Sequence, residues 1–315
     1  MRRSSLIATR PAGLVCRHTG GMPPPLDDLV AGVRRSIGAA IFERVAGQDG
    51  GEVRQRLNRA DVVRWFEPGS PITRVHGDAS MFIGGLSALL LQSLHPLAMA
   101  GVDQHSGFRG DPWGRLGRTS RFLAVTTYGS AQDAQREIDV VKAVHRRVVG
   151  LAADGRPYSA NDPHLLSWVH LAEVTSFLAA HRRFGSEVLS PAERDEYVAQ
   201  SGEVARVLGA DDVPTTVAEA TDLLESFRPE LATTPAARAA ARYLVVTPPL
   251  PLPLRGAYLP IAGSAIALLP RWARWPLRLP WLPVTEATVV RGAGEAITRT
   301  IRWALTPPAD PTTGL

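Results

Sequence analysis

Three histidines, His95, His145 and His170, each fall on the apolar face of a predicted helix. Apolar residues recur at helical spacing around them, as Val141 and Val148 do around His145. One such histidine is usually a hydrogen-bonded core residue, but three are harder to explain in that way. Imidazoles that project inward from helices are how all-α proteins hold haem or non-haem iron. The sequence therefore offers three candidate ligands for iron.

A second set of polar residues lies on one face of a single predicted helix. Arg115, Arg118, Thr119 and Phe122 occur at positions i, i+3, i+4 and i+7, so two guanidinium groups and a hydroxyl precede an apolar position. An exposed arginine pair is one interpretation. The other is a clamp for an anion, or a polar roof over a reaction pocket.

Other common catalytic constellations are missing from the sequence. There is no Glu-x-x-His motif, and only Glu173, one turn from His170, brings a carboxylate near a candidate histidine, which argues against a di-iron bundle. The single cysteine, Cys16, excludes a thiolate zinc site and a haem attached through CxxCH. No GxSxG, P-loop or GxGxxG sequence supports serine hydrolysis, nucleotide hydrolysis or dinucleotide binding.

The 315 residues have a globular composition, with 45% hydrophobic and 21% charged residues and a net charge of +5. Lys142 is the only lysine, and nine arginines lie between residues 238 and 303 against Glu286 and Glu295. The basic charge is thus concentrated near the C-terminus. Because no nucleic-acid-binding motif accompanies it, we do not expect a nucleic-acid partner.

Hydrophobic periodicity predicts a series of helices without alternating strands, which indicates an all-α fold. Capping residues support several boundaries: Asn161 or Asp162 before Pro163, and a capping box from Ser190 to Glu193. The apolar segment 79–102 has the length of a membrane span, but we expect a central core helix broken near Pro96. The predicted helices cover 26–45, 53–66, 79–102, 116–128, 131–149, 163–185, 191–208 and 216–227.

The C-terminal segment has a different character, rich in proline, tryptophan and arginine. Residues 247–253 contain four prolines and are predicted to be neither helix nor central strand. Residues 257–269 are apolar but too short to span a bilayer, and we expect Pro260 to break them. Tryptophans and arginines then alternate through residues 271–281. We expect a helical cover on the core with arginines reaching water, the alternative being peripheral contact with a membrane surface.

These patterns divide the chain into three parts. Residues 1–25 lack periodicity and are expected to form a disordered tail, residues 26–240 a helical domain, and residues 241–315 an extension packed on it. Arg2 and Arg3 are not followed by an apolar segment typical of an export signal. We therefore expect a cytoplasmic protein, with membrane association as the alternative.

Several short strings between His95 and Gly209 resemble one known family when they are taken in order. They are Leu91-Gln92-Ser93-Leu94-His95-Pro96, Arg115-Leu116-Gly117-Arg118-Thr119, Tyr128-Gly129, His145 with Gly150, the segment from Pro157 to Pro163, and Trp168-Val169-His170. The chain is similar over roughly residues 70–230 to the MpaB and latex-clearing-protein (rubber oxygenase) catalytic-domain family. The resemblance implies a globin-like all-helical domain that holds a non-covalent haem b. It also implies cleavage of carbon–carbon double bonds in apolar isoprenoid chains with dioxygen.

The resemblance assigns roles to individual residues. His145 matches the proximal axial ligand of the haem iron, while His95 and His170 belong to family motifs and are expected at the cofactor without a defined role. Arg115 to Thr119 match a distal Arg-x-x-Lys-Thr element in which Arg118 stands at the lysine position. A guanidinium has no lone pair for iron, so we expect a distal side that is open, water-bound or differently closed.

The leading hypothesis is therefore a haem-b-dependent oxygenase acting on an apolar, isoprenoid-like small molecule with dioxygen. His145 would hold the iron, and Arg115, Arg118 and Thr119 would be the catalytic or propionate-binding groups. The first alternative is a haem-binding or electron-transfer protein without turnover, with His170 as second axial ligand and a redox partner. The second is a non-catalytic lipid binder that uses the Trp/Arg segment.

Overall fold

The computed structural model describes residues 26–46, 50–57, 59, 61–105 and 110–306, so the predicted tail 1–25 lies outside the described residues. Helices dominate this part of the chain, and the all-α prediction is confirmed. The helices of the first two thirds are α1 (Leu26–Ala46), α2 (Gly50–Leu57), α3 (Pro71–Gly77), α4 (Met81–Gln92), α5 (Pro96–His105), α6 (Pro112–Tyr128), α7 (Ala131–His145), α8 (Pro163–Phe184), α9 (Pro191–Leu208) and α10 (Val217–Phe227).

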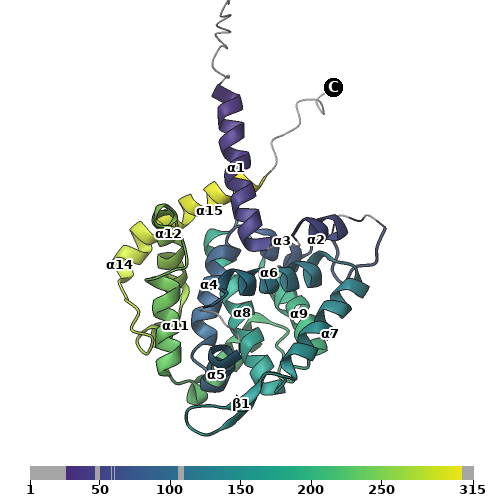
Figure 1. Ribbon diagram of the computed structural model, residues 1–315, viewed down its shortest axis with the longest axis vertical. Coiled ribbons are helices and arrows are strands. Elements are labelled where there is room, and N and C mark those ends of the chain that lie inside the picture. Colours follow the sequence, from purple (N-terminus) through teal and green to yellow (C-terminus); the bar gives the residue numbers. More distant parts are fainter. Residues whose placement is uncertain (1–25, 47–49, 58, 60, 106–109, 307–315) are drawn as a thin grey trace, which may run out of the picture.

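The C-terminal third begins with the 3₁₀ turn η1 and contains further helices (Figure 1). They are η1 (Arg228–Glu230), α11 (Pro235–Val245), α12 (Leu252–Leu268), α13 (Arg271–Arg274), α14 (Pro283–Thr285), the π-helical turn η2 (Glu286–Val290) and α15 (Arg291–Leu305). In Figure 1, α11, α12 and α14 form one side of the molecule, while α1 projects from the body beside α15.

The core is built around two crossed helices, α4 and α8. They approach closely at Gly84, where a Cβ atom would lie 3.1 Å from the Cα atom of Phe177 and 3.1 Å from the Cβ atom of Ala180. Fully buried Trp168 and Tyr197 extend this core towards α10 and α9. A glycine at the crossing therefore sets the distance between the two central helices.

The apolar segment 79–102 forms two helices rather than one. The helices α4 and α5 meet at an angle of 108°, with Pro96 as the first residue of α5. The prediction of a core helix broken near Pro96 is confirmed. No single helix among the described residues is both long and apolar enough to cross a membrane, and this bent pair passes that test only by length and composition.

Local capping determines the starts of α8 and α9 as the sequence predicted. The Asp162 side chain accepts hydrogen bonds from the backbone N–H groups of His164 and Leu165. Ser190 and Glu193 form the reciprocal capping box at the start of α9. The helix α9 ends at Gly209, whose φ of 113° lies in the left-handed region that glycine tolerates best.

Two predicted helices end earlier than expected. The helix predicted over 53–66 ends at Leu57. The Arg64 guanidinium caps this end, because it donates a hydrogen bond to the Leu57 carbonyl at 3.0 Å. The helix predicted over 131–149 ends at His145 and is followed by strands β1 (Val149–Leu151) and β2 (Pro157–Ser159), which pair antiparallel. A Cβ atom at Gly150 would lie 2.6 Å from the Tyr158 hydroxyl, so the ribbon requires glycine there.

The prediction that Pro260 breaks the apolar C-terminal segment is wrong. The helix α12 continues through Pro260, and it begins at Leu252, inside the segment predicted to be non-helical. The carbonyl that loses its helical partner belongs to Gly256, which is exposed and has no side chain to hinder water or the proline ring. That carbonyl is therefore open to solvent.

Candidate functional site

His145 is the last residue of α7, and two hydrogen bonds hold the end of this helix in place. Lys142 Nζ donates to the carbonyl of Val207 in α9 at 3.1 Å, and Asn161 Nδ2 donates to the Lys142 carbonyl at 3.2 Å. The position of the imidazole is thus defined by α9 and by the segment leading into α8.

The His145 ring has a buried nitrogen without a partner. Its Nδ1 atom is inaccessible to solvent and has no hydrogen bond within the described part of the chain. Burial lowers the pKa of the imidazole below its usual range, so the ring is neutral at physiological pH. A neutral imidazole with an unused nitrogen can serve as a metal ligand.

His170 and Glu173 lie one turn apart on α8, in the middle of the helix. The Nε2 atom of His170 is also buried and lacks a hydrogen-bond partner among the described residues. Burial, with a smaller effect of the Arg206 charge, lowers the pKa of His170 to about 4. Burial raises the pKa of Glu173 to about 7, so this carboxyl group can hold a proton near neutrality.

A polar network lies beyond Glu173. The Tyr197 hydroxyl lies 3.4 Å from Nε2 of His76, and Nδ1 of His76 lies 2.8 Å from the Thr127 hydroxyl. Burial raises the pKa of Tyr197, and the negative charge of Glu173 raises it further. The network thus connects α9, α3 and α6 with Glu173 of α8.

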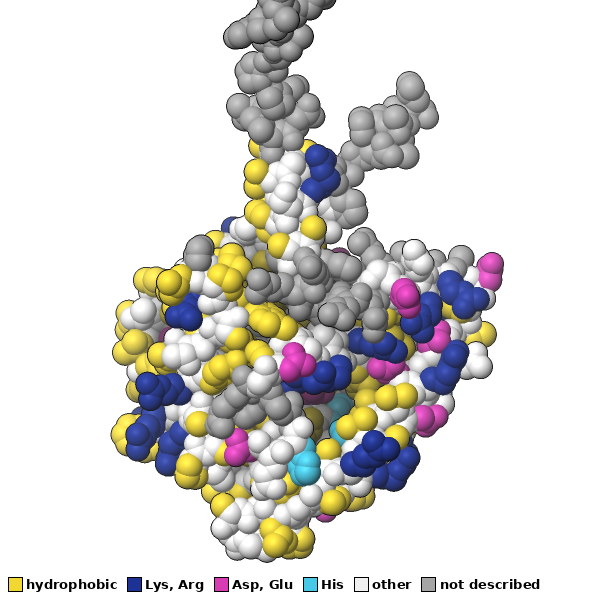
Figure 2. All heavy atoms as spheres, in the orientation of Figure 1, with side chains coloured by type: hydrophobic (Ala, Val, Ile, Leu, Met, Phe, Trp, Pro, Cys, Tyr) yellow, Lys and Arg dark blue, Asp and Glu magenta, His cyan; other side chains and the backbone are white. Residues whose placement is uncertain are grey.

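Figure 2 shows that the face formed by α6, α7 and β1 is hollowed, with histidine side chains visible within the hollow. The apolar side chains Val140 and Val144 on α7, and Val149 and Leu151 on β1, are all more than half exposed on the segments that flank His145. These four exposed side chains form an apolar rim that is suited to contact with apolar molecules.

The three predicted catalytic residues on α6 differ in their environments. Arg115 is partly buried, and burial, together with the nearby Arg118 charge, lowers its pKa. Arg118 is exposed and lies 3.5 Å from the Asp111 carboxylate, and Thr119 is exposed as well. Arg115 is thus the most buried of the three side chains.

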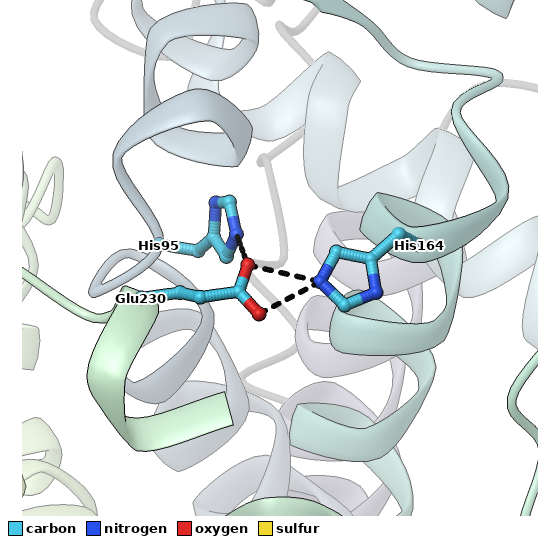
Figure 3. A group of neighbouring side chains, drawn as sticks. All are labelled: His95, His164 and Glu230. Atoms are coloured by element: carbon cyan, nitrogen blue, oxygen red, sulfur yellow. Dashed lines mark hydrogen bonds and ion pairs between the residues drawn. The ribbon is translucent and has the colours of Figure 1, made fainter. Parts of the chain in front are cut away.

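His95 belongs to a different group of side chains. Its ring lies 6.1 Å from that of Trp168 and 6.5 Å from that of His164. His170 follows Trp168 by two residues, a rotation of about 200° around α8, so it projects from the opposite side of that helix. Figure 3 shows His95, His164 and Glu230 pointing towards one another.

Sequence reasoning missed His164 and Glu230. His164 precedes Trp168 by one turn, and that spacing is a local signal that could have placed it on the same side of α8 as His95. Glu230 lies 66 residues beyond His164 and is brought there by the turn η1, for which the sequence offered no indication.

Comparison with known protein families matches residues 73–303 to the family described as ER-bound oxygenase mpaB/B'/rubber oxygenase, catalytic domain. The chain belongs to this family. Searches among curated proteins and among solved structures found no match. The mpaB/rubber oxygenase match extends beyond the motifs to α15, so the C-terminal helices are part of the catalytic domain. Family membership makes the chain an oxygenase, with a substrate and dioxygen as its reactants.

Proposed function

We propose that this member of the mpaB/rubber oxygenase family is a haem-b-dependent oxygenase that acts on an apolar, isoprenoid-like substrate. The observation that carries the proposal is the pair of buried, unpartnered ring nitrogens on His145 and His170, in the described part of the chain. A buried polar atom without a hydrogen bond is costly, and a bound ligand is one of the few explanations for it.

The residues present fit a haem group. Because burial keeps the His145 pKa low, its imidazole is available in the neutral form that iron binds. Arg115 would contribute a positive charge from a partly buried position, where it would bind a propionate or polarise an oxygen atom. Bound haem would supply the iron centre that activates dioxygen.

The proton needed near such a centre can be held by Glu173. With a pKa of about 7, its carboxyl group exists in both protonation states near neutral pH. It can therefore donate a proton at one carboxyl oxygen or accept one there.

The apolar rim supports an apolar substrate. The rim consists of exposed side chains on α7, which also carries His145, and on the strand β1 that follows it. They are Val140, Val144, Val149 and Leu151. Covering them removes apolar surface from water, which favours binding of a hydrocarbon chain. Arg118 and Thr119, being exposed, would act at the entrance rather than beside the buried imidazoles.

Electron transfer without turnover is the alternative that one observation favours. His170 also has an unused, neutral nitrogen, and a haem bound by two histidines has no free position for dioxygen. A redox partner would then take the place of an organic substrate. Access of carbon monoxide to reduced iron distinguishes the two functions.

The C-terminal helices support peripheral contact with an anionic membrane. Trp275 is 87% exposed and Val284 76% exposed. The Arg271 guanidinium lies 4.2 Å from the centre of the Trp281 ring, and Figure 2 shows hydrophobic and basic side chains side by side over α11 to α14. Tryptophan and arginine together suit the interface of an anionic bilayer, where an apolar substrate would also dissolve.

Absorption spectra of the haem-reconstituted protein test the proposal. We expect a Soret band that shifts when the reduced protein binds carbon monoxide, and loss of this band in His145→Ala. His105→Ala, which removes an exposed histidine that bonds to the Tyr158 hydroxyl and not to His145, should keep it. A reduced protein indifferent to carbon monoxide would support electron transfer instead. A His145→Ala protein with full haem content and native circular dichroism would refute the ligand assignment.

A further inference from the structure

A second group of potential ligands lies apart from His145 and His170. His95 follows α4, His164 is in the first turn of α8, and Glu230 ends η1. One ligand atom from each lies within 4.8 Å of the others. Three segments separated in sequence thus bring two imidazoles and one carboxylate to one point (Figure 3).

The contacts within this group leave His95 unsatisfied. Nε2 of His164 lies 2.9 Å from Oε2 of Glu230, so these two side chains are hydrogen-bonded. Nε2 of His95 lies 3.5 Å from the same oxygen, without the geometry of a hydrogen bond. The His95 side chain is only 2% exposed, and neither ring nitrogen has a hydrogen-bond partner among the described residues.

The surroundings hold the two rings on the same side of α8. The His164 ring stacks on Phe227 with 4.5 Å between ring centres, and the same phenyl ring contacts Trp168. Trp168 in turn lies against His95 and is anchored by its Nε1 donating to the Gln92 carbonyl at 3.0 Å. An apolar wall behind two imidazoles, with a carboxylate in front, is typical of metal sites.

We propose that His95, His164 and Glu230 bind a divalent transition-metal ion, as a site separate from the haem site. Two imidazole nitrogens and one carboxylate are ligands that Zn²⁺ and Fe²⁺ accept. Ligands at about 2.1 Å from a tetrahedral ion lie about 3.4 Å from one another, so distances within the group must shorten by up to about 1.4 Å. The His164 and Glu230 side chains are 43% and 42% exposed and can make that movement.

The arrangement also predicts which coordination positions of the metal ion are left free by the protein. His95 would bind from the buried side, while exposed His164 and Glu230 leave the remaining coordination positions towards solvent. A site with three protein ligands and a free position can accept water or a small anionic molecule.

Titration of the metal-free, tag-free full-length protein with Co²⁺ tests the proposal. Co²⁺ replaces Zn²⁺ and gives visible absorption bands whose intensity reports low coordination number. We expect one ion per chain for the wild type, and at least tenfold weaker binding for His164→Ala and for Glu230→Gln. The two side chains are 43% and 42% exposed, and circular dichroism should stay native in both variants.

Two control variants assign the signal to this site. His105→Ala removes an exposed histidine, and His145→Ala removes the proposed haem ligand, and both should bind Co²⁺ as the wild type does. Zn²⁺ should raise the melting temperature of the wild type and not that of Glu230→Gln. Equal binding by all variants, no binding at micromolar concentrations, or loss of the bands in His145→Ala would overturn the proposal.

Discussion

Arg302 on α15 forms a bidentate ion pair with the carboxylate of Asp78, which directly follows α3. Its Nε atom lies 2.9 Å from Oδ2 and its Nη2 atom 3.1 Å from Oδ1. The same guanidinium donates to the carbonyl of Phe184, and Asp78 also accepts hydrogen bonds from the backbone and side chain of Ser186. The end of α8 and the C-terminal helix are thereby fixed to the beginning of the catalytic domain.

Replacing Asp78 should weaken the fold in a pH-dependent manner. Burial by itself raises the pKa of Asp78, but hydrogen bonds from Arg302, Ser80 and Ser186 bring it far below its usual range. We expect Asp78→Asn to lower the free energy of unfolding by about 3 kcal/mol at pH 7. The difference should persist down to about pH 4, the pKa in the unfolded chain, and vanish as pH falls towards the folded-state pKa.

Urea denaturation at pH 7 and at pH 2 measures this effect. Glu295→Gln, at an exposed pair with Arg291 on α15, is the matched control and should change stability by less than about 0.5 kcal/mol. If Asp78→Asn loses the same free energy at both pH values, the carboxylate charge is not the cause.

Two adjacent glycines on α4 should respond oppositely to alanine. At Gly84 the new methyl group would meet Phe177 and Ala180 of α8 at 3.1 Å, whereas at Gly85 nothing lies within 4 Å. Gly85→Ala should stabilise the protein by about 0.5–1 kcal/mol through helix propensity. Gly84→Ala should destabilise it by about 1 kcal/mol or more, because the central helices must separate. The melting temperatures of both variants test this prediction. Equal shifts of the two melting temperatures would contradict the close crossing of α4 and α8.

Glu173 should make the haem-free protein less stable as the pH rises. Its pKa of about 7 lies above that of an unfolded chain, so the folded state binds the proton more tightly. Stability is therefore full below about pH 4.5 and declines through pH 7, by about 3 kcal/mol in all for this group. Glu173→Gln should abolish that decline between pH 5.5 and 8.5 in urea denaturation, while exposed Glu203→Gln should retain it.

The two arginines of α6 should differ in their importance for turnover. Arg115 is partly buried, and its loss should lower kcat by about a hundredfold if it stabilises developing negative charge. Arg118 is 67% exposed in its side chain and faces Asp111, so Arg118→Gln should change kcat less than about threefold. Oxygen uptake with an apolar alkene measures both. The reverse order would place Arg118 at the reacting atoms.

Membrane contact should depend on the exposed tryptophans. We expect the wild type to co-sediment with vesicles that contain anionic phospholipid at low salt, and not with purely zwitterionic vesicles. Replacing Trp275, which is 87% exposed, by serine should weaken this binding at least tenfold without affecting stability. Val188→Ser, at a 93% exposed position after the end of α8, is the control and should bind vesicles as the wild type does. Equal sedimentation of wild type and Trp275→Ser would argue against a lipid contact there.

Local patterns in the sequence were sufficient for most of the helical framework. Capping depends on residues within one turn, so Asp162, Ser190 and Glu193 defined the starts of α8 and α9 correctly. The break near Pro96 followed from proline chemistry alone. The early end of α2 did not, because its cap comes from Arg64, and Pro260 is tolerated only because Gly256 is exposed.

By itself the sequence determined the all-α class, the family and three histidines suited to metal binding, because these depend on residue types and on spacing within a helix. Only the tertiary structure decided which histidines meet. His95 joins His164 and Glu230 because the bend at Pro96 and the turn η1 bring them to one side of α8, while His170 projects from the other. Such contacts arise from the packing of distant segments, and no local pattern encodes them.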